Sequence, residues 1–156
     1  MIRFEQVSKI YPGGFAAVKN LSFTINKGEM IFLAGHSGAG KSTVLKLISG
    51  ITRPTEGKVW MNNQNISDLS DNQLGYLRQH IGIVFQDHKI LYDRNVLQNV
   101  LLPLRIIGYD SAQAEKRARI AIEKVGLAGK ETADPITLSG GEQQRLCIAR
   151  AVVHQP

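Results

Sequence analysis

Apolar and polar positions alternate along the first part of the chain, and this pattern predicts strands. Residues 2–7 alternate apolar and polar side chains, which is typical of a half-buried strand, and shorter strands are predicted within residues 17–25. Two uninterrupted apolar runs, Met30–Ala34 and Ile81–Phe85, instead predict buried strands of a parallel sheet. We therefore expect an antiparallel β region laid against an α/β core.

Turn and helix signals divide the rest of the chain. Asn62 and Asn63 can adopt the positive φ angles of a tight hairpin between strands at 58–61 and 64–66. Asp110 with Gln113 resembles a capping box that opens a helix. Helices are predicted at residues 44–48, around 74–78, at 95–101 before Pro103, from Asp110 to Gly126, and at 145–153, with a non-helical loop at 132–137 around Pro135.

These elements favour one α/β domain with a helical insertion. Residues 87–130 look mainly helical, whereas residues 1–86 and 131–156 carry the predicted sheet and the helices beside it. A length of 156 residues with 43% hydrophobic and 21% charged residues is typical of a single globular domain.

Composition limits the cellular compartment and the kind of partner that we expect for this chain. The single cysteine, Cys147, excludes an internal disulfide and fits a reducing compartment, and no apolar run is long enough for a membrane span. We expect a cytosolic chain. A net charge of +6 permits an anionic partner, although the densest basic cluster, Lys116–Arg119, is better interpreted as a solvated helix face.

A glycine-rich loop between the first predicted core strand and the next helix carries the clearest chemical signal. It fits the phosphate-binding pattern G-x-x-x-x-G-K-[ST] and comprises Gly35, His36, Ser37, Gly38, Ala39, Gly40, Lys41, Ser42 and Thr43. Backbone N–H groups at the helix N-terminus would face the phosphates. Lys41 would reach the β- and γ-phosphates, and the Ser42 hydroxyl would bind Mg²⁺. An accidental match in a chain of this length has a probability on the order of one per cent, so we favour nucleotide binding.

A second loop resembles an anion site. A serine and two glycines stand directly before the last predicted helix, where an N-cap hydroxyl and accessible N–H groups are available. The segment comprises Leu138, Ser139, Gly140, Gly141, Glu142, Gln143 and Gln144. Two such sites about a hundred residues apart require either two ligands or one ligand shared between two subunits.

Two further residues have open interpretations from the sequence alone. Tyr11 could stack on a purine or simply pack in its turn. Gln86 follows the second core strand, where it could join Mg²⁺, orient a water molecule, or be an ordinary surface amide.

The loop at Gly35–Ser42 together with Leu138–Gln144 resembles the motifs of ATP-binding cassette ATPases. The resemblance covers the whole chain. It implies that Tyr11 is the aromatic A-loop residue and that Gln86 is the Q-loop glutamine, catalytic and a Mg²⁺ ligand with Ser42. It also implies a head-to-tail homodimer, in which Ser139 and Gly141 close over the γ-phosphate held by the other subunit's Lys41.

Within that family the residues at 1–5, 35–40 and 85–88, with Asp93 and Arg94, are most similar to the cell-division branch in bacteria. This similarity implies docking on the membrane protein FtsX at the inner face of the cytoplasmic membrane. There, ATP turnover would control cell-wall hydrolysis at the division site. The segment after Gln86, with Ile90, Leu91 and Tyr92 expected to be exposed, is the predicted partner surface, and a local core formed by these residues is the alternative.

One departure from the family concerns hydrolysis. The family continues into an apolar strand that ends in Asp-Glu and then to a switch histidine, but no apolar run here ends in Asp-Glu. His36, His80, His88 and His154 lie outside the expected position. We expect a truncated ATPase that holds the binding half of the site and binds ATP without hydrolysing it.

Two other functions share these motifs. Exporter ATPases of the lipoprotein-releasing or macrolide type differ mainly in their membrane partner, which this chain does not contain. DNA-maintenance ATPases use the same signature but need a long coiled coil between the two motifs, and no heptad run occurs between 43 and 138. No nucleic-acid partner is therefore expected.

Overall fold

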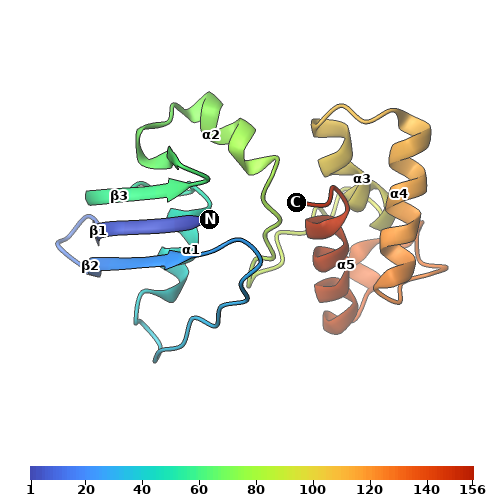
Figure 1. The fold of residues 1–156 in the computed structure, drawn as a ribbon. Coiled ribbons are helices and arrows are strands. Elements are labelled where there is room, and N and C mark those ends of the chain that lie inside the picture. Colours follow the sequence, from blue (N-terminus) through green and yellow to red (C-terminus); the bar gives the residue numbers. More distant parts are fainter. The chain divides into compact units, whose positions relative to one another are not determined.

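The structure is a computed structural model that describes residues 1–156. The chain forms two compact units, Met1–Arg78 and Gln79–Pro156, and each is described by itself (Figure 1).

The first unit is built on a four-stranded antiparallel sheet. Its strands are β1 (Ile2–Ile10), β2 (Ala16–Ile25), β3 (Glu56–Met61) and β4 (Gln64–Asn65), in the order β2-β1-β3-β4. The predicted hairpin is confirmed, because Asn62 and Asn63 have φ angles of 48° and 66° between β3 and β4. The two short strands predicted within 17–25 are one continuous strand, β2.

One face of this sheet packs on two helices (Figure 1). They are α1 (Lys41–Ile48) and α2 (Asp71–Arg78), with a short 3₁₀ turn at Ile66–Asp68. In β1 a bulge between Phe4 and Val7 lets both side chains face the core although they are three residues apart. The Phe4 and Phe23 rings stack with centroids 4.5 Å apart. The buried core comprises Phe4, Val7, Val18, Val44, Leu47, Val59, Ile66, Leu69 and Leu74.

The two predicted core strands are not strands in this structure. Residues 30–34 and 81–85 have no sheet partner, and the side chains of Met30 and Phe32 are 81% and 86% exposed. A parallel strand requires a hydrogen-bonded neighbour, and the described sheet contains antiparallel pairs only. The apolar composition of these runs therefore predicted neither their backbone pairing nor, for residues 30–33, their burial in this structure.

The second unit is helical. Helices α3 (Val96–Ile106), α4 (Ser111–Lys124) and α5 (Gly140–Val152) pack on one another, and a 3₁₀ turn covers Pro135–Thr137. Its buried core comprises Ile90, Val96, Val100, Leu101, Leu104, Ala114, Ala118, Ala121, Ile122, Leu127, Leu138, Leu146, Cys147, Ala149 and Val153.

Two prolines in this unit behave differently from the prediction. Helix α3 continues through Pro103 to Ile106, because the fully buried Leu104 anchors its last turn against the core. Pro135 starts a 3₁₀ turn instead of a loop, at a position where the missing N–H costs nothing. Helix α5 also begins at Gly140, five residues before the predicted start, because Ser139 caps it.

A buried amide fixes the segment before α3. Asn99 is fully buried, and its Nδ2 donates to the carbonyl oxygens of Leu91 and Arg94, each at 2.9 Å. Arg150 on α5 donates to the carbonyl oxygens of Lys89 and His88, both at 2.8 Å. These bonds hold residues 88–94 against α3 and α5. None of the helices combines the length and the apolar composition required to cross a lipid bilayer.

Candidate nucleotide-binding site

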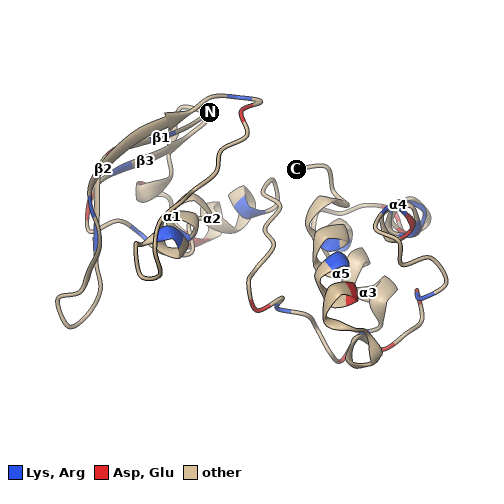
Figure 2. Cartoon of the chain, turned by 90° about the horizontal axis from the view of Figure 1, so that it is seen from below, with Lys and Arg blue, Asp and Glu red and all other residues tan.

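The glycine-rich loop leads directly into α1 and leaves the start of that helix open. Gly40 is the N-cap residue with φ 84°, no side chain caps the first turn, and the Val44 N–H donates to the Gly40 carbonyl at 2.9 Å. Helix α1 has no acidic residue, whereas Lys41 and Lys46 are basic (Figure 2). The free N–H groups, the helix dipole and Lys41, which stands in the first turn, therefore all favour an anion here.

Lys41 folds back over the loop. Its Nζ donates to the carbonyl oxygens of Gly35 at 2.6 Å and His36 at 2.7 Å. His36 Nδ1 lies 2.7 Å from the Ser37 carbonyl oxygen, and the Ala39 N–H donates to His36. These bonds order the loop, but both partners of the Lys41 ammonium are neutral. Its charge is thus available to a phosphate.

Gly40 is required by close packing. A Cβ at this position would lie 2.2 Å from the carbonyl oxygen of Ala17 on β2, and φ of +84° disfavours any other residue. Gly38 also has a positive φ of 82°, but a Cβ there would meet nothing within 4 Å. The sheet therefore sets the position of the loop at Gly40, while Gly38 leaves room in front of the loop.

Tyr11 lies beside the first turn of α1. Its hydroxyl is 3.4 Å from Oγ1 of the buried Thr43, and Lys9 Nζ is 5.4 Å from its ring centroid. The sequence gives no signal for the contact with Thr43, since the two residues are 32 positions apart. The half-buried ring is held next to the glycine-rich loop, where a base could stack on it. Ser42, the proposed Mg²⁺ ligand, is exposed.

The signature segment forms the capped start of α5. The Ser139 hydroxyl accepts from the Glu142 N–H at 3.4 Å, and Glu142 Oε2 accepts from the Ser139 N–H at 2.9 Å. Glu142 also forms an ion pair with Lys130, which the sequence analysis did not identify. The hydrogen bond from Lys130, with those from Ser139, lowers the pKa of Glu142 to about 2.

The two signature glycines are not needed for packing. Neither has a positive φ, a Cβ at Gly140 would meet nothing within 4 Å, and one at Gly141 would meet only the end of the Arg145 side chain at 3.7 Å. Neither backbone conformation nor packing within this chain therefore requires glycine at these two positions. What the two glycines provide is free space in front of the start of α5. In contrast, Leu138 is buried in the core, and Gln143 Nε2 donates to the Pro135 and Leu138 carbonyl oxygens, so both side chains hold the loop itself.

Gln86 lies in an exposed turn of the second unit. Its neighbour Asp87 forms an ion pair with Lys89 at 2.6 Å, and the hydrogen bond from Lys89 lowers the pKa of Asp87. Tyr11 and the glycine-rich loop belong to the first unit, whereas Gln86 and the signature segment belong to the second.

The first unit has the features needed to bind the phosphate groups of a nucleoside triphosphate. An uncapped helix N-terminus, a glycine that cannot carry a Cβ and an ammonium without a carboxylate partner are the features that phosphate oxygens require. The exposed Ser42 hydroxyl, next to this position, is a suitable oxygen ligand for Mg²⁺.

Comparison with known families agrees with this geometry. The family described as ABC transporter matches residues 18–156. The chain belongs to this family. It is 53% identical over 156 residues to the cell division ATP-binding protein FtsE of Escherichia coli K12, and spans 70% of that protein. It is 39% identical to FtsE of Bacillus subtilis, spanning 68% of it. It is 42% identical to the methionine import ATP-binding protein MetN of Geobacillus kaustophilus, spanning 46% of it.

Solved structures of the family share the fold. The dimeric structure of MJ0796, a bacterial ABC transporter cassette, has a TM-score of 0.94 and 38% identity, with 100% of this chain and 71% of that chain covered. A post-hydrolysis state of the same cassette, bound to ADP and Pi, has the same TM-score and 37% identity. The predicted ABC ATPase fold class is thus confirmed, although the parallel strands predicted within it are not formed.

Proposed function

We propose that this protein is the ATP-binding subunit of a membrane-associated complex in bacterial cell division, working with FtsX. The observation that carries the proposal is the 53% identity to FtsE along the entire chain, which includes an open phosphate-binding loop. In this role it acts on the cytoplasmic side of the inner membrane at the division site, where ATP-driven changes control cell-wall hydrolysis.

Each site residue has a role in this proposal. Lys41 and the N–H groups of residues 35–43 bind the β- and γ-phosphates, and Tyr11 stacks on the base. Ser42 and Gln86 hold Mg²⁺, which neutralises charge on the phosphates. Two copies pair head to tail, so that Ser139 and Gly141 of one subunit contact the γ-phosphate bound by the other.

Hydrolysis requires a base that these 156 residues do not supply in a suitable state. Asp87 and Glu142 are the acidic residues closest in sequence to Gln86 and the signature glycines. Both are ion-paired, and both have a lowered pKa, about 2 for Glu142. A carboxylate already held by a lysine ammonium is not free to take a proton from water. We therefore propose that this stretch of chain binds ATP without turnover.

The membrane partner contacts the segment after Gln86 in this proposal. Ile90 was expected to be exposed but is only 8% exposed, because it packs in the helical core. Leu91 was also expected to be exposed but is half-buried. Tyr92 is 55% exposed, in the segment that Asn99 and Arg150 hold in place. An exposed aromatic side chain on a backbone segment that is held in place is suited to a protein interface.

The alternative functions are a DNA-maintenance ATPase and the ATPase of an exporter or importer, and different observations bear on each. A DNA-maintenance ATPase is disfavoured, because α2, α3 and α4 have only 8, 11 and 14 residues and leave no place for a long coiled coil. Exporters and importers share the loop and the signature, and MetN is an import protein with 42% identity to this chain. The membrane partner separates them.

Co-purification tests the proposal. The tagged protein would be co-expressed separately with FtsX, with a methionine-import membrane subunit and with a lipoprotein-export membrane subunit, and captured from detergent extracts. We expect FtsX alone to be retained, and Tyr92→Asp to abolish its retention. Ile136→Asp is a matched control, since Ile136 is 74% exposed in the same unit but outside the segment. Retention of another membrane subunit in place of FtsX would refute the cell-division role.

A further inference from the structure

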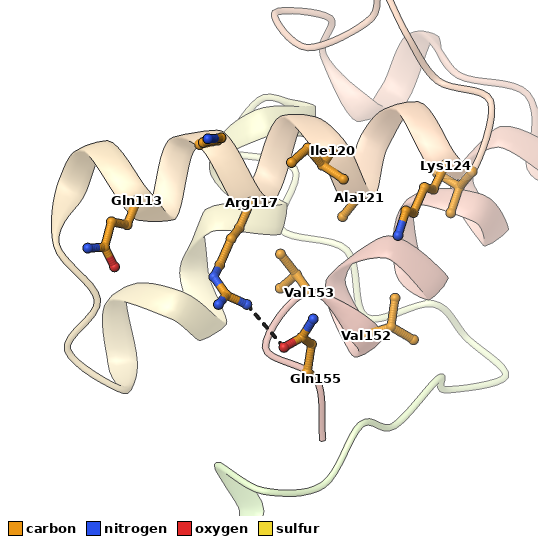
Figure 3. A pocket seen from close by; sticks show the side chains of 10 residues that line it. Gln113, Arg117, Ile120, Ala121, Lys124, Val152, Val153 and Gln155 are labelled. Atoms are coloured by element: carbon orange, nitrogen blue, oxygen red, sulfur yellow. Dashed lines mark hydrogen bonds between the residues drawn. The ribbon is translucent and has the colours of Figure 1, made fainter.

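A pocket lies in the second unit, on the side of α4 that faces the end of α5. Its volume is about 720 Å³, within the range of small-ligand sites, roughly 300–1,000 Å³. Figure 3 shows the Arg117, Ile120 and Lys124 side chains reaching from α4 toward the residues after α5. The lining residues are Gln113, Lys116, Arg117, Ile120, Ala121, Lys124, Val125, Val152, Val153 and Gln155.

The charge of this pocket is of one sign. Lys116, Arg117 and Lys124 line it, and no carboxylate does. The remaining arginine of the cluster, Arg119, forms an ion pair with Glu115 at 2.7 Å, and neither of these two residues lines the pocket. Helix α4 thus carries a neutralised pair outside the pocket and three cationic residues that line it.

Arg117 is positioned in advance. Its guanidinium donates to Gln155 Oε1 at 3.2 Å (Figure 3). The guanidinium also lies 5.0 Å from the centroid of the Tyr109 ring. Both contacts orient the group without neutralising its charge, and a planar guanidinium can donate two parallel hydrogen bonds to a phosphate. An anion in the pocket would therefore meet a donor that is already ordered.

Beneath the cations the wall is apolar. Ala121 and Val153 are almost fully buried, while Ile120 and Val152 remain 43% and 50% exposed. Apolar side chains left partly exposed beside fixed polar groups are typical of a ligand site. A simple inorganic anion would not cover them, so the ligand needs an apolar part as well as a charge.

We propose that this pocket binds a phosphate ester that carries an apolar group. The three cations can offset the double negative charge of a phosphate monoester, and the apolar wall covers the attached hydrocarbon. Two sources share this chemistry: a soluble organic phosphate, and phosphatidic acid, a phospholipid whose headgroup is itself a phosphate monoester. The site is distinct from the ATP site proposed at Lys41, which belongs to the first unit.

Calorimetric titration with a water-soluble short-chain phosphatidic acid tests the proposal. Saturating Mg-ATP is present throughout, so that the loop at Lys41 is occupied. We expect Arg117→Gln and Lys124→Gln each to weaken binding about tenfold, the loss of one charge-assisted contact. Arg119→Gln is the matched control, because it removes the same charge from the same helix outside the pocket.

A further variant tests the apolar wall. Val152→Glu places an acid at a half-exposed position of the pocket and should abolish binding, while circular dichroism and the melting temperature stay close to those of the parent protein. If Arg119→Gln weakened binding as much as Arg117→Gln, or if the probe bound only when Mg-ATP was left out, the pocket would not be the site.

Vesicles distinguish the two sources of the ligand. Sedimentation with phosphatidic acid vesicles, compared with phosphatidylcholine vesicles, should show binding that Arg117→Gln and Val152→Glu reduce if the ligand is a membrane lipid. Binding to the short-chain probe alone would assign a soluble phosphate ester. The absence of binding to both probes would overturn the proposal.

Discussion

The two helix starts proposed to share one nucleotide are built in opposite ways. Helix α1 begins at Gly40 with no side-chain cap and no acid in its first turn. Helix α5 begins at Ser139 with a complete capping box, in which Glu142 accepts from the Ser139 N–H while Lys130 pairs with its other oxygen. The positive end of the α1 dipole is therefore open to a ligand, whereas the Glu142 carboxylate covers part of the positive end of α5.

This difference assigns different tasks to the two motifs. Because nothing competes for the N–H groups of α1, a phosphate can bind there to an isolated subunit. At α5 an incoming phosphate would meet the negative charge of Glu142, so Gly140 and Gly141 can contribute only with help from a second set of contacts. We therefore expect nucleotide affinity to reside in the first unit and dimer formation in the second.

The largest effect is expected at Gly40. In Gly40→Ala the new Cβ would lie 2.2 Å from the Ala17 carbonyl oxygen, so the loop must move away from β2. We expect nucleotide binding to become undetectable and the free energy of unfolding to fall by about 2 kcal/mol or more. Fluorescence titration with an ATP analogue and thermal melting measure the two changes.

Gly38→Ala provides the control for this prediction. It places alanine at a similarly positive φ, 82°, but in open space. It should therefore cost only the backbone strain, about 1–2 kcal/mol, without the steric clash. Equal losses in the two variants would show that packing against β2 does not set the loop position.

The next effect is expected at Lys41. Lys41→Ala removes the ammonium that bonds the Gly35 and His36 carbonyl oxygens and is proposed to bind phosphate. Affinity for the ATP analogue should fall by about 2–5 kcal/mol, with a melting temperature close to that of the parent protein. Lys46→Ala, in the last turn of the same helix, is the matched control and should leave affinity nearly unchanged. Unaltered binding in Lys41→Ala would contradict the phosphate-binding role of the loop.

At α5 the expected effect is on pairing rather than on affinity. Ser139→Tyr replaces the N-cap with a bulky side chain at an exposed position and loses a cap worth about 1 kcal/mol. Monomers should still bind the ATP analogue normally, whereas ATP-dependent dimers, measured by light scattering, should disappear. Normal ATP-dependent dimer formation by this variant would contradict the shared-site arrangement. A lower affinity of the monomer for the ATP analogue would contradict the division of tasks between the two motifs.

Local chemistry made the two motifs predictable from sequence. The hairpin at Asn62–Asn63, the N-caps at Asp110 and Ser139, and the end of α4 before Gly126 each depend on residues within a few positions of one another. The glycine pattern before Lys41 is local in the same sense. Such signals act through backbone conformation and short hydrogen bonds, so the sequence contains all of their causes.

Features that depend on distant partners were not predictable. Residues 30–34 are apolar enough for a core strand, but strand formation needs a neighbour that the described sheet does not provide. Ile90 was expected on the surface, yet the helical core buries it. The pairing of Lys130 with Glu142 likewise has no local signal, since it joins residues 12 positions apart across a loop.

The smallest effect is a pH dependence confined to α5. The pKa of Glu142, about 2, lies below its ordinary value of 4.5, so the ionised carboxylate favours the folded state above about pH 4.5. This contribution is lost as the pH falls from 4.5 toward 2, because the unfolded chain takes up the proton first. Denaturant unfolding of the second unit should show Glu142→Gln less stable than the parent protein at pH 6, with the gap closing as the pH approaches 2. Glu123→Gln, at an exposed position of α4, should show no comparable gap. If the difference in free energy of unfolding between Glu142→Gln and the parent protein stayed constant down to pH 2, the Glu142 carboxylate would not stabilise the helix start through its charge. The two helix starts would then differ only in the geometry of their caps.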